Sequence, residues 1–149
     1  MRNARPGDAE ALARLHREAR AAAMPWLPIL HTPEEDHAFF ETVLSGPSQL
    51  TICEADSQPA AFIATRPGWI DHLYVAPAHW RRGYGRRLLS FTQAMQGGLQ
   101  LWTFQDNTAA RSFYAAHGFR EAELTDGANN EERTPDVRLV WTAPASPLA

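Results

Sequence analysis

The segment from Trp69 to Gln96 constrains the fold most, because it places a strand, a short loop with two glycines and a helix in immediate succession. Residues 69–75 have the pattern of a strand, and Pro77 prevents its extension because proline cannot donate to a sheet ladder. The helix over residues 83–96 carries Leu88 and Leu89 on its apolar side. A strand that leads directly into an amphipathic helix predicts a sheet with helices packed on its faces.

The rest of the chain supplies similar elements around this unit. Asp8 is expected to cap the first helix, and Thr32-Pro33-Glu34-Glu35 forms a capping box at the start of the second. The turn Asp56-Ser57-Gln58-Pro59 is expected to join two strands. The order of elements predicts a single domain over residues 1–149 with a mixed α/β (α+β) architecture. The further elements are helices over 8–23, 32–44 and 108–117, strands over 49–55, 60–66, 99–104, 119–124 and 136–141, and a polar loop over 125–134.

Composition excludes several classes of protein. The formal net charge of -3 over 149 residues argues against general binding to nucleic acid or to an anionic membrane. Cys53 is the single cysteine and lies in an apolar run, so we expect a buried thiol and no internal disulfide. The histidines lack the spacing of a metal-binding pair, and we predict no metal. Because the first residues lack an apolar signal segment and no apolar stretch reaches roughly 18 residues, we expect a cytoplasmic, soluble protein.

The loop before the helix at Gly83 has the composition of an anion site. A helix N-terminus presents unpaired backbone N–H groups, and glycine lets the backbone approach phosphate oxygens closely. A P-loop would need a lysine, which the chain lacks, and a dinucleotide fingerprint would need a third glycine where Leu88 stands. On these residues alone, a pyrophosphate site and a solvated basic helix start are equally open. The arginines that could pair with phosphates are Arg81, Arg82, Arg86 and Arg87.

Two segments resemble the signature motifs of the GNAT superfamily of N-acetyltransferases. The first comprises Leu73-Tyr74-Val75-Ala76-Pro77 and, from residue 81, Arg-Arg-Gly-Tyr-Gly-Arg-Arg-Leu-Leu. It is similar to the family's acetyl-CoA motif, in which Gln or Arg precedes two spaced small residues. Gly83 and Gly85 match these small positions, whereas Trp80 stands at the Gln/Arg position. Since the family binds the pyrophosphate through backbone amides of this loop, the role of the loop is expected to survive this change.

The second segment, from Asn107 to Phe119, is similar to the family pattern N-x-x-A-x-x-F-Y-x-x-x-G-F. With the order of the elements, the resemblance covers roughly the whole chain. It implies a mostly antiparallel twisted sheet of about six to seven strands, flanked by about four helices. The matching residues of this segment are Asn107, Ala110, Phe113, Tyr114, Gly118 and Phe119.

The resemblance implies an acetyl-CoA-dependent N-acetyltransferase that transfers an acetyl group directly to a primary amine in a ternary complex. It implies that Tyr114 protonates the departing thiolate. It also implies that Asn107 binds the pantetheine arm, which is compatible with capping the following helix only if the two roles use different groups of the residue. The residues implied to bind acetyl-CoA, as co-substrate, are Leu73, Tyr74, Val75, Arg81, Arg82, Gly83, Tyr84, Gly85, Arg86 and Asn107.

The sequence leaves the general base open. A free alkyl ammonium has a pKa of about 10.4, so attack at neutral pH needs a base or a water chain. Some family members carry a glutamate where Trp69 stands. Strand alternation predicts Trp69, Asp71, Leu73 and Val75 on one face, and Ile70, His72 and Tyr74 on the other. Asp71 is therefore the first candidate for the base, and His72 or a water relay without a dedicated base are the alternatives.

The acceptor is expected to be a small-molecule or peptide amine, and the sequence does not identify it. By resemblance, its pocket is shaped by Met24–His31, including Trp26, and by the loop Asp126–Arg133. Glu131 and Glu132 either attract a cationic amine or are solvated loop acids. A homodimer is left open. Two other functions compete: a non-catalytic acyl-CoA-binding or sensing domain, and a nucleic-acid-binding domain that uses the clustered arginines, which the net charge disfavours.

Overall fold

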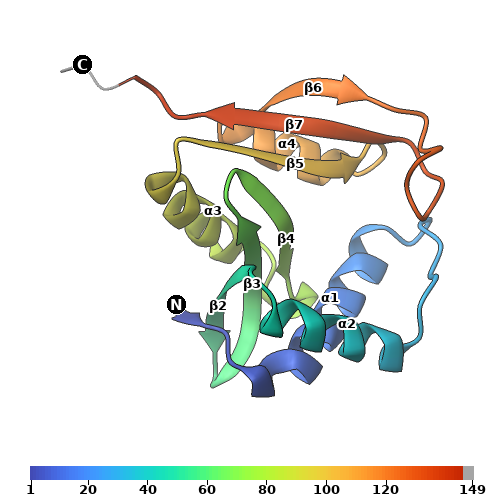
Figure 1. The fold of residues 1–149 in the computed structure, drawn as a ribbon, viewed down its shortest axis with the longest axis vertical. Coiled ribbons are helices and arrows are strands. Elements are labelled where there is room, and N and C mark those ends of the chain that lie inside the picture. The colour runs from blue at the N-terminus through green and yellow to red at the C-terminus, as the bar shows by residue number, and fades with distance from the viewer. Residues whose placement is uncertain (146–149) are drawn as a thin grey trace.

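Seven strands form one sheet in the order β1-β2-β3-β4-β5-β7-β6, as drawn in Figure 1. The computed structural model describes residues 1–145 of the chain. Neighbouring strands are antiparallel except β4 and β5, which are parallel. The strands are β1 Arg2–Asn3, β2 Gln49–Ala55, β3 Gln58–Arg66, β4 Trp69–Val75, β5 Gly98–Phe104, β6 Arg120–Leu124 and β7 Asp136–Thr142. The helices are α1 Ala9–Ala23, α2 Pro33–Ser45, α3 Tyr84–Met95 and α4 Thr108–Ala116, with short 3-10 turns η1 Pro6–Asp8 and η2 Pro77–His79.

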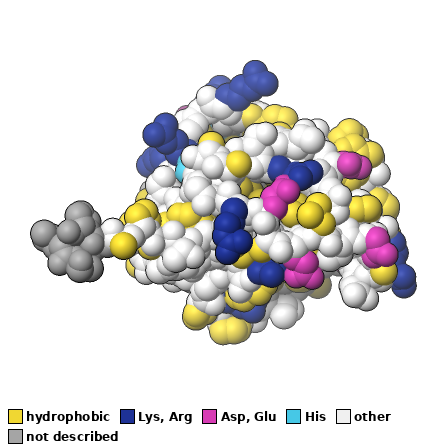
Figure 2. Space-filling view, turned by 90° about the horizontal axis from the view of Figure 1, so that it is seen from above, with side chains coloured by type: hydrophobic (Ala, Val, Ile, Leu, Met, Phe, Trp, Pro, Cys, Tyr) yellow, Lys and Arg dark blue, Asp and Glu magenta, His cyan; other side chains and the backbone are white. Residues whose placement is uncertain are grey.

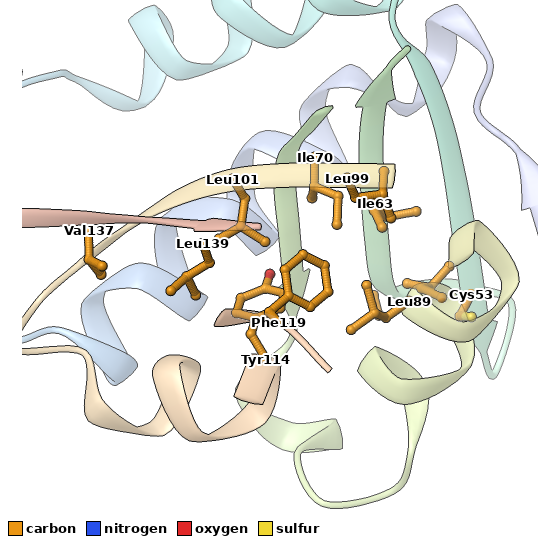
Figure 3. Close-up of a cluster of buried hydrophobic side chains, with 12 residues drawn as sticks. Cys53, Ile63, Ile70, Leu89, Leu99, Leu101, Tyr114, Phe119, Val137 and Leu139 are labelled. Atoms are coloured by element: carbon orange, nitrogen blue, oxygen red, sulfur yellow. The ribbon is translucent and has the colours of Figure 1, made fainter. Parts of the chain in front are cut away.

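Helices cover both faces of the sheet and define two hydrophobic cores. On one face, α1 and α2 pack Leu12 and Phe40 against Phe62 of β3. On the other face, α3 and α4 pack Leu88 and Tyr114 against a larger cluster that draws on β2 to β5 and on β7. Figure 3 shows this second cluster, with the ring of Tyr114 beside Phe119. The mixed sheet with four α-helices confirms the predicted fold class.

The sheet separates between β4 and β5. These two strands share a single register pair, Trp69 opposite Gln100, and the backbone N–H of Gln100 also donates to the carbonyl of Gly68 at 2.9 Å. Beyond this point the edge of β4 that faces β5 has no strand partner among the described residues. Figure 1 shows the consequence, because β5 and β7 run across the molecule while β2, β3 and β4 run at a steep angle to them. The backbone of β4 is therefore available to something other than a strand.

Some local predictions are wrong in detail. Asp8 does not cap α1 with its side chain; its carboxylate instead accepts hydrogen bonds from Arg2 at 2.8 and 2.9 Å and from the backbone N–H of Arg5 at 2.6 Å. The turn between β2 and β3 is shorter than expected. Asp56 and Ser57 alone form it, with φ of 52° and 63°, and β3 begins at Gln58. A left-handed pair of this kind matches the twist of a tight hairpin. The capping box at Thr32 is confirmed, because both of its hydrogen bonds are present.

A β-bulge at Asp71 changes the faces of β4. Ala64 of β3 pairs with His72, whereas the next residue, Thr65, pairs with Ile70, so Asp71 has no partner in the register. The extra residue shifts the alternation by one position. Ile70 therefore lies in the same core as Leu73, and the prediction that it shares a face with His72 and Tyr74 is wrong. The bulge turns Asp71 out of the regular pleat, next to the point where β4 leaves β5.

No helix within residues 1–145 is long and apolar enough to cross a membrane.

Candidate active site

A cleft opens where β4 and β5 separate. Its walls come from the end of α1, from β4 and β5, and from one side of α4 with its N-cap residue. Met24 and Phe104 line it together with residues that the sequence analysis had singled out. The cleft thus gathers side chains from segments far apart in the chain. The predicted site residues that it brings together are Asp71, His72, Leu73, Tyr74, Asn107 and Tyr114.

Tyr114 extends from α4 into the core beside this cleft and is 7% exposed. Its ring makes edge contacts with Phe113 at 5.2 Å and with Phe119 at 5.3 Å, which fix its orientation. Burial raises the pKa of the Tyr114 hydroxyl, and the nearby Tyr74 raises it further. The hydroxyl has no hydrogen-bond partner within residues 1–145. Tyr114 is therefore a rigidly held phenol that stays protonated at neutral pH.

His72 and Tyr74 meet His16 of α1 in an aromatic cluster below the cleft. The ring of His16 lies 4.7 Å from that of Tyr74 and 5.6 Å from that of His72, edge to face in both cases. Burial lowers the pKa of His72 to about 4 and that of His16 to about 3. Neither ring nitrogen of His16 has a hydrogen-bond partner in the described part of the chain. Both histidines are uncharged at neutral pH.

Asp71 lines the cleft but is not free. Arg66 donates to both of its oxygens, from Nε at 2.6 Å and from Nη2 at 2.7 Å, and the guanidinium also lies over the ring of Trp69. Such a two-point pair fixes the carboxylate and occupies a lone pair on each oxygen. The structure therefore places the first candidate for the general base at the cleft, already bound to an arginine that the sequence analysis did not consider.

The loop from Trp80 to Gly83 leads into α3 with its backbone donors unused. None of the backbone N–H groups from Arg81 to Arg86 donates a hydrogen bond to residues 1–145. Arg81 and Gly83 have positive φ, 63° and 84°, and no side chain caps the helix. A chain that turns through left-handed residues in this way presents a concave row of N–H groups that suits an anion. A Cβ on Gly83 would meet no atom within 4 Å, so the space above the loop is open.

The predicted arginines surround this loop and are exposed. None of Arg81, Arg82, Arg86 and Arg87 forms an ion pair within residues 1–145. By contrast, Figure 2 shows that the face over β5, β6 and β7 mixes basic, acidic and hydrophobic side chains. The unneutralised arginines are thus confined to the start of α3. A basic patch this small suits a phosphate group better than the extended surface of a nucleic acid.

Trp80 has a structural explanation. Its indole Nε1 donates to the carbonyl of Val75 at 2.8 Å, so the side chain ties the loop to the last residue of β4. The ring is 41% exposed. At this position the tryptophan supplies one side-chain donor to the loop, and it leaves the following backbone N–H groups free.

Only the oxygen of the Asn107 side chain is used within the described chain. Its Oδ1 accepts from the backbone N–H of Ala110 at 3.2 Å, which caps α4. Its side-chain amide donates to no residue of the described chain, and Asn107 lines the cleft. Capping therefore leaves the NH2 group available to a ligand.

The segment between α1 and α2 is fastened to the loop between β6 and β7. His31 lies 2.5 Å from Glu131, and Arg20 of α1 lies 3.7 Å from Glu132. Glu131 raises the pKa of His31, which favours the charged pair. Trp26 meets Phe104 of β5 edge to face at 6.4 Å. Both loop acids thus have cationic partners, and the segments expected to shape the acceptor pocket do lie against each other.

Other chemistry is absent from the described residues. Cys53 is 1% exposed in the core, and burial raises its thiol pKa, so the expectation of a buried, inert thiol is confirmed. Within residues 1–145 no group of three or more histidine, cysteine or acidic side chains has the arrangement of a metal site.

These features define an acyltransferase of a known class. A protein-family model described as an acetyltransferase (GNAT) domain matches residues 46–121, which is more than half of the chain. The chain therefore belongs to the GNAT acetyltransferase family. The match contains the whole loop from Trp80 to Gly83, here called the anion loop, and the cleft residues of β4 and α4.

Individual relatives agree with this assignment. The chain is 33% identical over 96 residues to the peptidyl-lysine N-acetyltransferase YiaC of Escherichia coli K12, a match that covers 63% of this chain and 64% of that protein. It is also similar to the solved apo structure of YjaB from Escherichia coli, with a TM-score of 0.77, 21% identity and coverage of 96% of this chain and 97% of that one. The structure of YncA from Salmonella typhimurium with acetyl-CoA gives a TM-score of 0.71 at 15% identity and covers 97% of this chain and 94% of that one. These likenesses confirm the fold.

Sequence reasoning missed three residues of the site. His16 and Arg66 approach β4 from other elements, and Phe104 ends β5 opposite Trp26. The predicted helix over residues 8–23 does contain His16, which follows the core residue Leu15. No local sequence pattern identifies Arg66, because its pairing with Asp71 depends on the β-bulge in β4.

Proposed function

We propose that this protein is an acetyl-CoA-dependent N-acetyltransferase that transfers the acetyl group directly to a primary amine while both substrates are bound. The observation that carries the proposal is the row of unpaired backbone N–H groups from Arg81 to Arg86, continuous with the unpaired edge of β4. A pyrophosphate fits the row of N–H groups, and an extended amide-containing arm fits the unpaired edge of β4. Their junction leads into the cleft beside Tyr114.

The residues divide the binding of acetyl-CoA between them. The N–H groups of Gly83, Tyr84 and Gly85 bind the pyrophosphate at the positive end of α3. The surrounding arginines Arg81, Arg82 and Arg86 attract its charge. The backbone of Leu73, Tyr74 and Val75 holds the pantetheine arm as a strand would be held, and the free NH2 group of Asn107 binds it from the opposite wall of the cleft.

Tyr114 serves as the general acid. Acetyl-CoA supplies an activated acyl thioester. When the acceptor amine attacks, the hydroxyl of Tyr114 gives its proton to the leaving sulfur, and the raised pKa keeps that proton in place until then. Direct transfer is favoured because the single cysteine, Cys53, is buried in the core away from the cleft and cannot hold the acyl group.

A panel of ligands tests the class of co-substrate. Thermal unfolding is measured alone and with acetyl-CoA, CoA, NADH or ATP. A ligand at about 100 times its Kd stabilises the native state by about 2.7 kcal/mol and raises Tm by roughly 5–11 °C in a chain of this size. We expect a shift with acetyl-CoA and CoA only. No shift with either would overturn the proposal.

Turnover then separates an enzyme from an acyl-CoA sensor. Release of free thiol from acetyl-CoA is followed in the presence of a mixture of amines. Amine-dependent release supports the enzyme, whereas binding of acetyl-CoA with no amine-dependent release would favour the sensing domain.

A further inference from the structure

The cleft contains no free carboxylate. Among its described lining residues, Asp71 is the only acidic side chain, and Arg66 holds both of its oxygens. The two acids of the last loop that could attract a cationic amine, Glu131 and Glu132, are paired with His31 and Arg20. A protonated amine that enters this cleft therefore finds no unpaired negative charge to bind it and no unengaged carboxylate to deprotonate it.

The histidines beside the cleft show what the environment does to a cation. His72 lies among the rings of Phe39, Phe40 and Phe62, and burial lowers its pKa to about 4. His16 behaves in the same way. His72 itself lines the cleft, so an ammonium group that binds beside it loses part of its water shell, and its neutral form is favoured there.

Charged neighbours do not reverse this effect. Asp71 raises the pKa of His72, but less than burial lowers it, and Arg20 of α1 lowers it further. Helix α2 packs the rings of Phe39 and Phe40 near His72, and β3 contributes Phe62. Tyr74 stays protonated because burial raises its pKa. The titratable or charged groups that face this region are Asp71, His72 and Tyr74 of β4, Arg66 of β3, His16 and Arg20 of α1, Tyr114 of α4, and Glu132 of the last loop.

We propose that the acceptor of this enzyme is an amine of low basicity, of the class of the α-amino group, which enters the cleft already uncharged, and that lysine side chains are poor acceptors. The inference rests on the proposed acetyltransferase function and deepens it. It requires no general base before attack, because solvent removes one proton from the ammonium group before binding. Attack on the thioester carbon forms the C–N bond; as the C–S bond breaks, the sulfur takes the proton of Tyr114 and the nitrogen loses its excess proton to solvent. Solvent then returns a proton to the Tyr114 phenolate.

The expected preference follows from the neutral fractions of the two amines. At pH 7 an α-amino group with a pKa of about 7.7–8.0 is roughly 10% neutral, whereas a lysine amine with a pKa of about 10.4 is roughly 0.04% neutral. The ratio is roughly 200-fold or more. The greater nucleophilicity of the more basic amine works against this ratio, so we expect a preference of at least about tenfold in kcat/KM.

Two matched peptides test the inference. The first is a hexapeptide without lysine, whose only amine is its N-terminus. The second has the same sequence with an acetylated N-terminus and one internal lysine. We expect the first to react faster at pH 7 and the advantage to shrink steadily up to pH 10, since kcat/KM for each peptide should rise with the titration of its own amine. An amide of the first amino acid, assayed alongside, distinguishes a small-molecule acceptor from a peptide.

Other outcomes overturn the inference. Equal or faster acetylation of the lysine peptide at pH 7 would contradict it, as would pH profiles that share one inflection for both peptides, because that inflection would belong to an enzyme base. Calorimetric titration with acetyl-CoA is made on the same preparation. Acetyl-CoA binding without acetylation of any α-amine overturns this inference alone, whereas loss of binding overturns the proposed function itself.

Arg66→Gln provides a second, opposite test. The substitution frees the carboxylate of Asp71, which can then bind and deprotonate an ammonium group. We expect the preference for the α-amine over lysine to fall by several-fold at pH 7, through a gain with the lysine peptide. Arg14→Gln, on α1 and outside the cleft, is the control and should keep the preference. An unchanged preference in Arg66→Gln would contradict the role given to the Arg66–Asp71 pair.

Discussion

Tyr114 belongs to the hydrophobic core and also borders the cleft. Tyr114→Phe removes a single oxygen that has no hydrogen-bond partner within residues 1–145. We expect kcat to fall by about 100-fold, within the range for loss of a general acid, while the Kd for acetyl-CoA changes less than about threefold. Steady-state kinetics and calorimetry on the same variant measure both. An unchanged kcat would remove Tyr114 from the proton transfer.

His16 places an imidazole in the core with both nitrogens unpaired. A buried polar group without a partner costs about 1–3 kcal/mol. His16→Phe keeps an aromatic ring beside Phe40 and Tyr74, and we therefore expect the free energy of unfolding at pH 7 to rise by about 1 kcal/mol. Urea unfolding checks this value. A clear loss of stability would mean that the native imidazole has a hydrogen-bond partner, such as an internal water.

At the scale of elements, the start of α3 can be tested with a matched pair of glycines. Gly83 and Gly68 both have left-handed φ, 84° and 79°, and a Cβ would meet no atom within 4 Å at either position. Valine at each site therefore introduces similar backbone strain. Gly83→Val should weaken acetyl-CoA binding by at least about tenfold, because the branched side chain covers the backbone N–H groups. Gly68→Val should lose stability to a similar degree and retain its affinity.

The loop between β6 and β7 closes on itself through a different glycine. A Cβ at Gly127, where φ is 83°, would lie 2.3 Å from the carbonyl carbon of Thr134. Asn130 spans the same loop, with its Nδ2 donating to the carbonyl of Thr134 at 2.6 Å. Gly127→Ala should therefore disturb the loop that carries Glu131.

The expected readout is a change in acceptor use. We expect Gly127→Ala to raise KM for the amine several-fold and to leave acetyl-CoA affinity unchanged, since the anion loop lies elsewhere. Gly68→Ala adds strain of about 1–2 kcal/mol without a clash and serves as the control. Equal KM values for the two variants would show that the last loop does not contact the acceptor.

At the scale of the whole molecule, the buried histidines make stability depend on pH. Both native pKa values, about 3 and about 4, lie below the ordinary histidine pKa of 6.5. Unfolding therefore takes up protons between about pH 6.5 and 4. As the pH is lowered through this window, the free energy of unfolding decreases, by up to about 1.4 kcal/mol per pH unit for each histidine. Above pH 6.5 the two groups contribute no slope.

Urea unfolding at pH 7, 6 and 5 measures this slope, and His16→Phe should reduce it by about half. The pair of His31 with Glu131 acts in the opposite direction, because its stabilisation is present at low pH and is lost as the pH rises through the raised pKa of His31. That histidine is exposed, and its effect is small. A wild-type slope that persists in His16→Phe would assign the acid sensitivity to other groups.

The sequence was a good guide to what depends on neighbours along the chain. The capping box at Thr32 and the helix start at Gly83 are local, and both are found. The arginine bound to Asp71 and the ring beside Tyr74 were not found, because each comes from another element. The faces of β4 were assigned incorrectly for the same reason, since a bulge is a relation between two strands. The predicted roles of the site residues await the experiments above.

The separation of β4 from β5 also has a consequence for self-association. Unpaired strand edges invite pairing with other chains, and proteins protect them with short or charged edge strands. Here the outer edges are protected in this way: β1 has two residues, and β6 is exposed along its length and carries Arg120, Glu121 and Glu123. The unprotected edge of β4 faces inward instead. Among the described residues the outer edges therefore disfavour strand-to-strand association with other copies, whereas the unpaired edge of β4 is the one that we propose for the pantetheine arm.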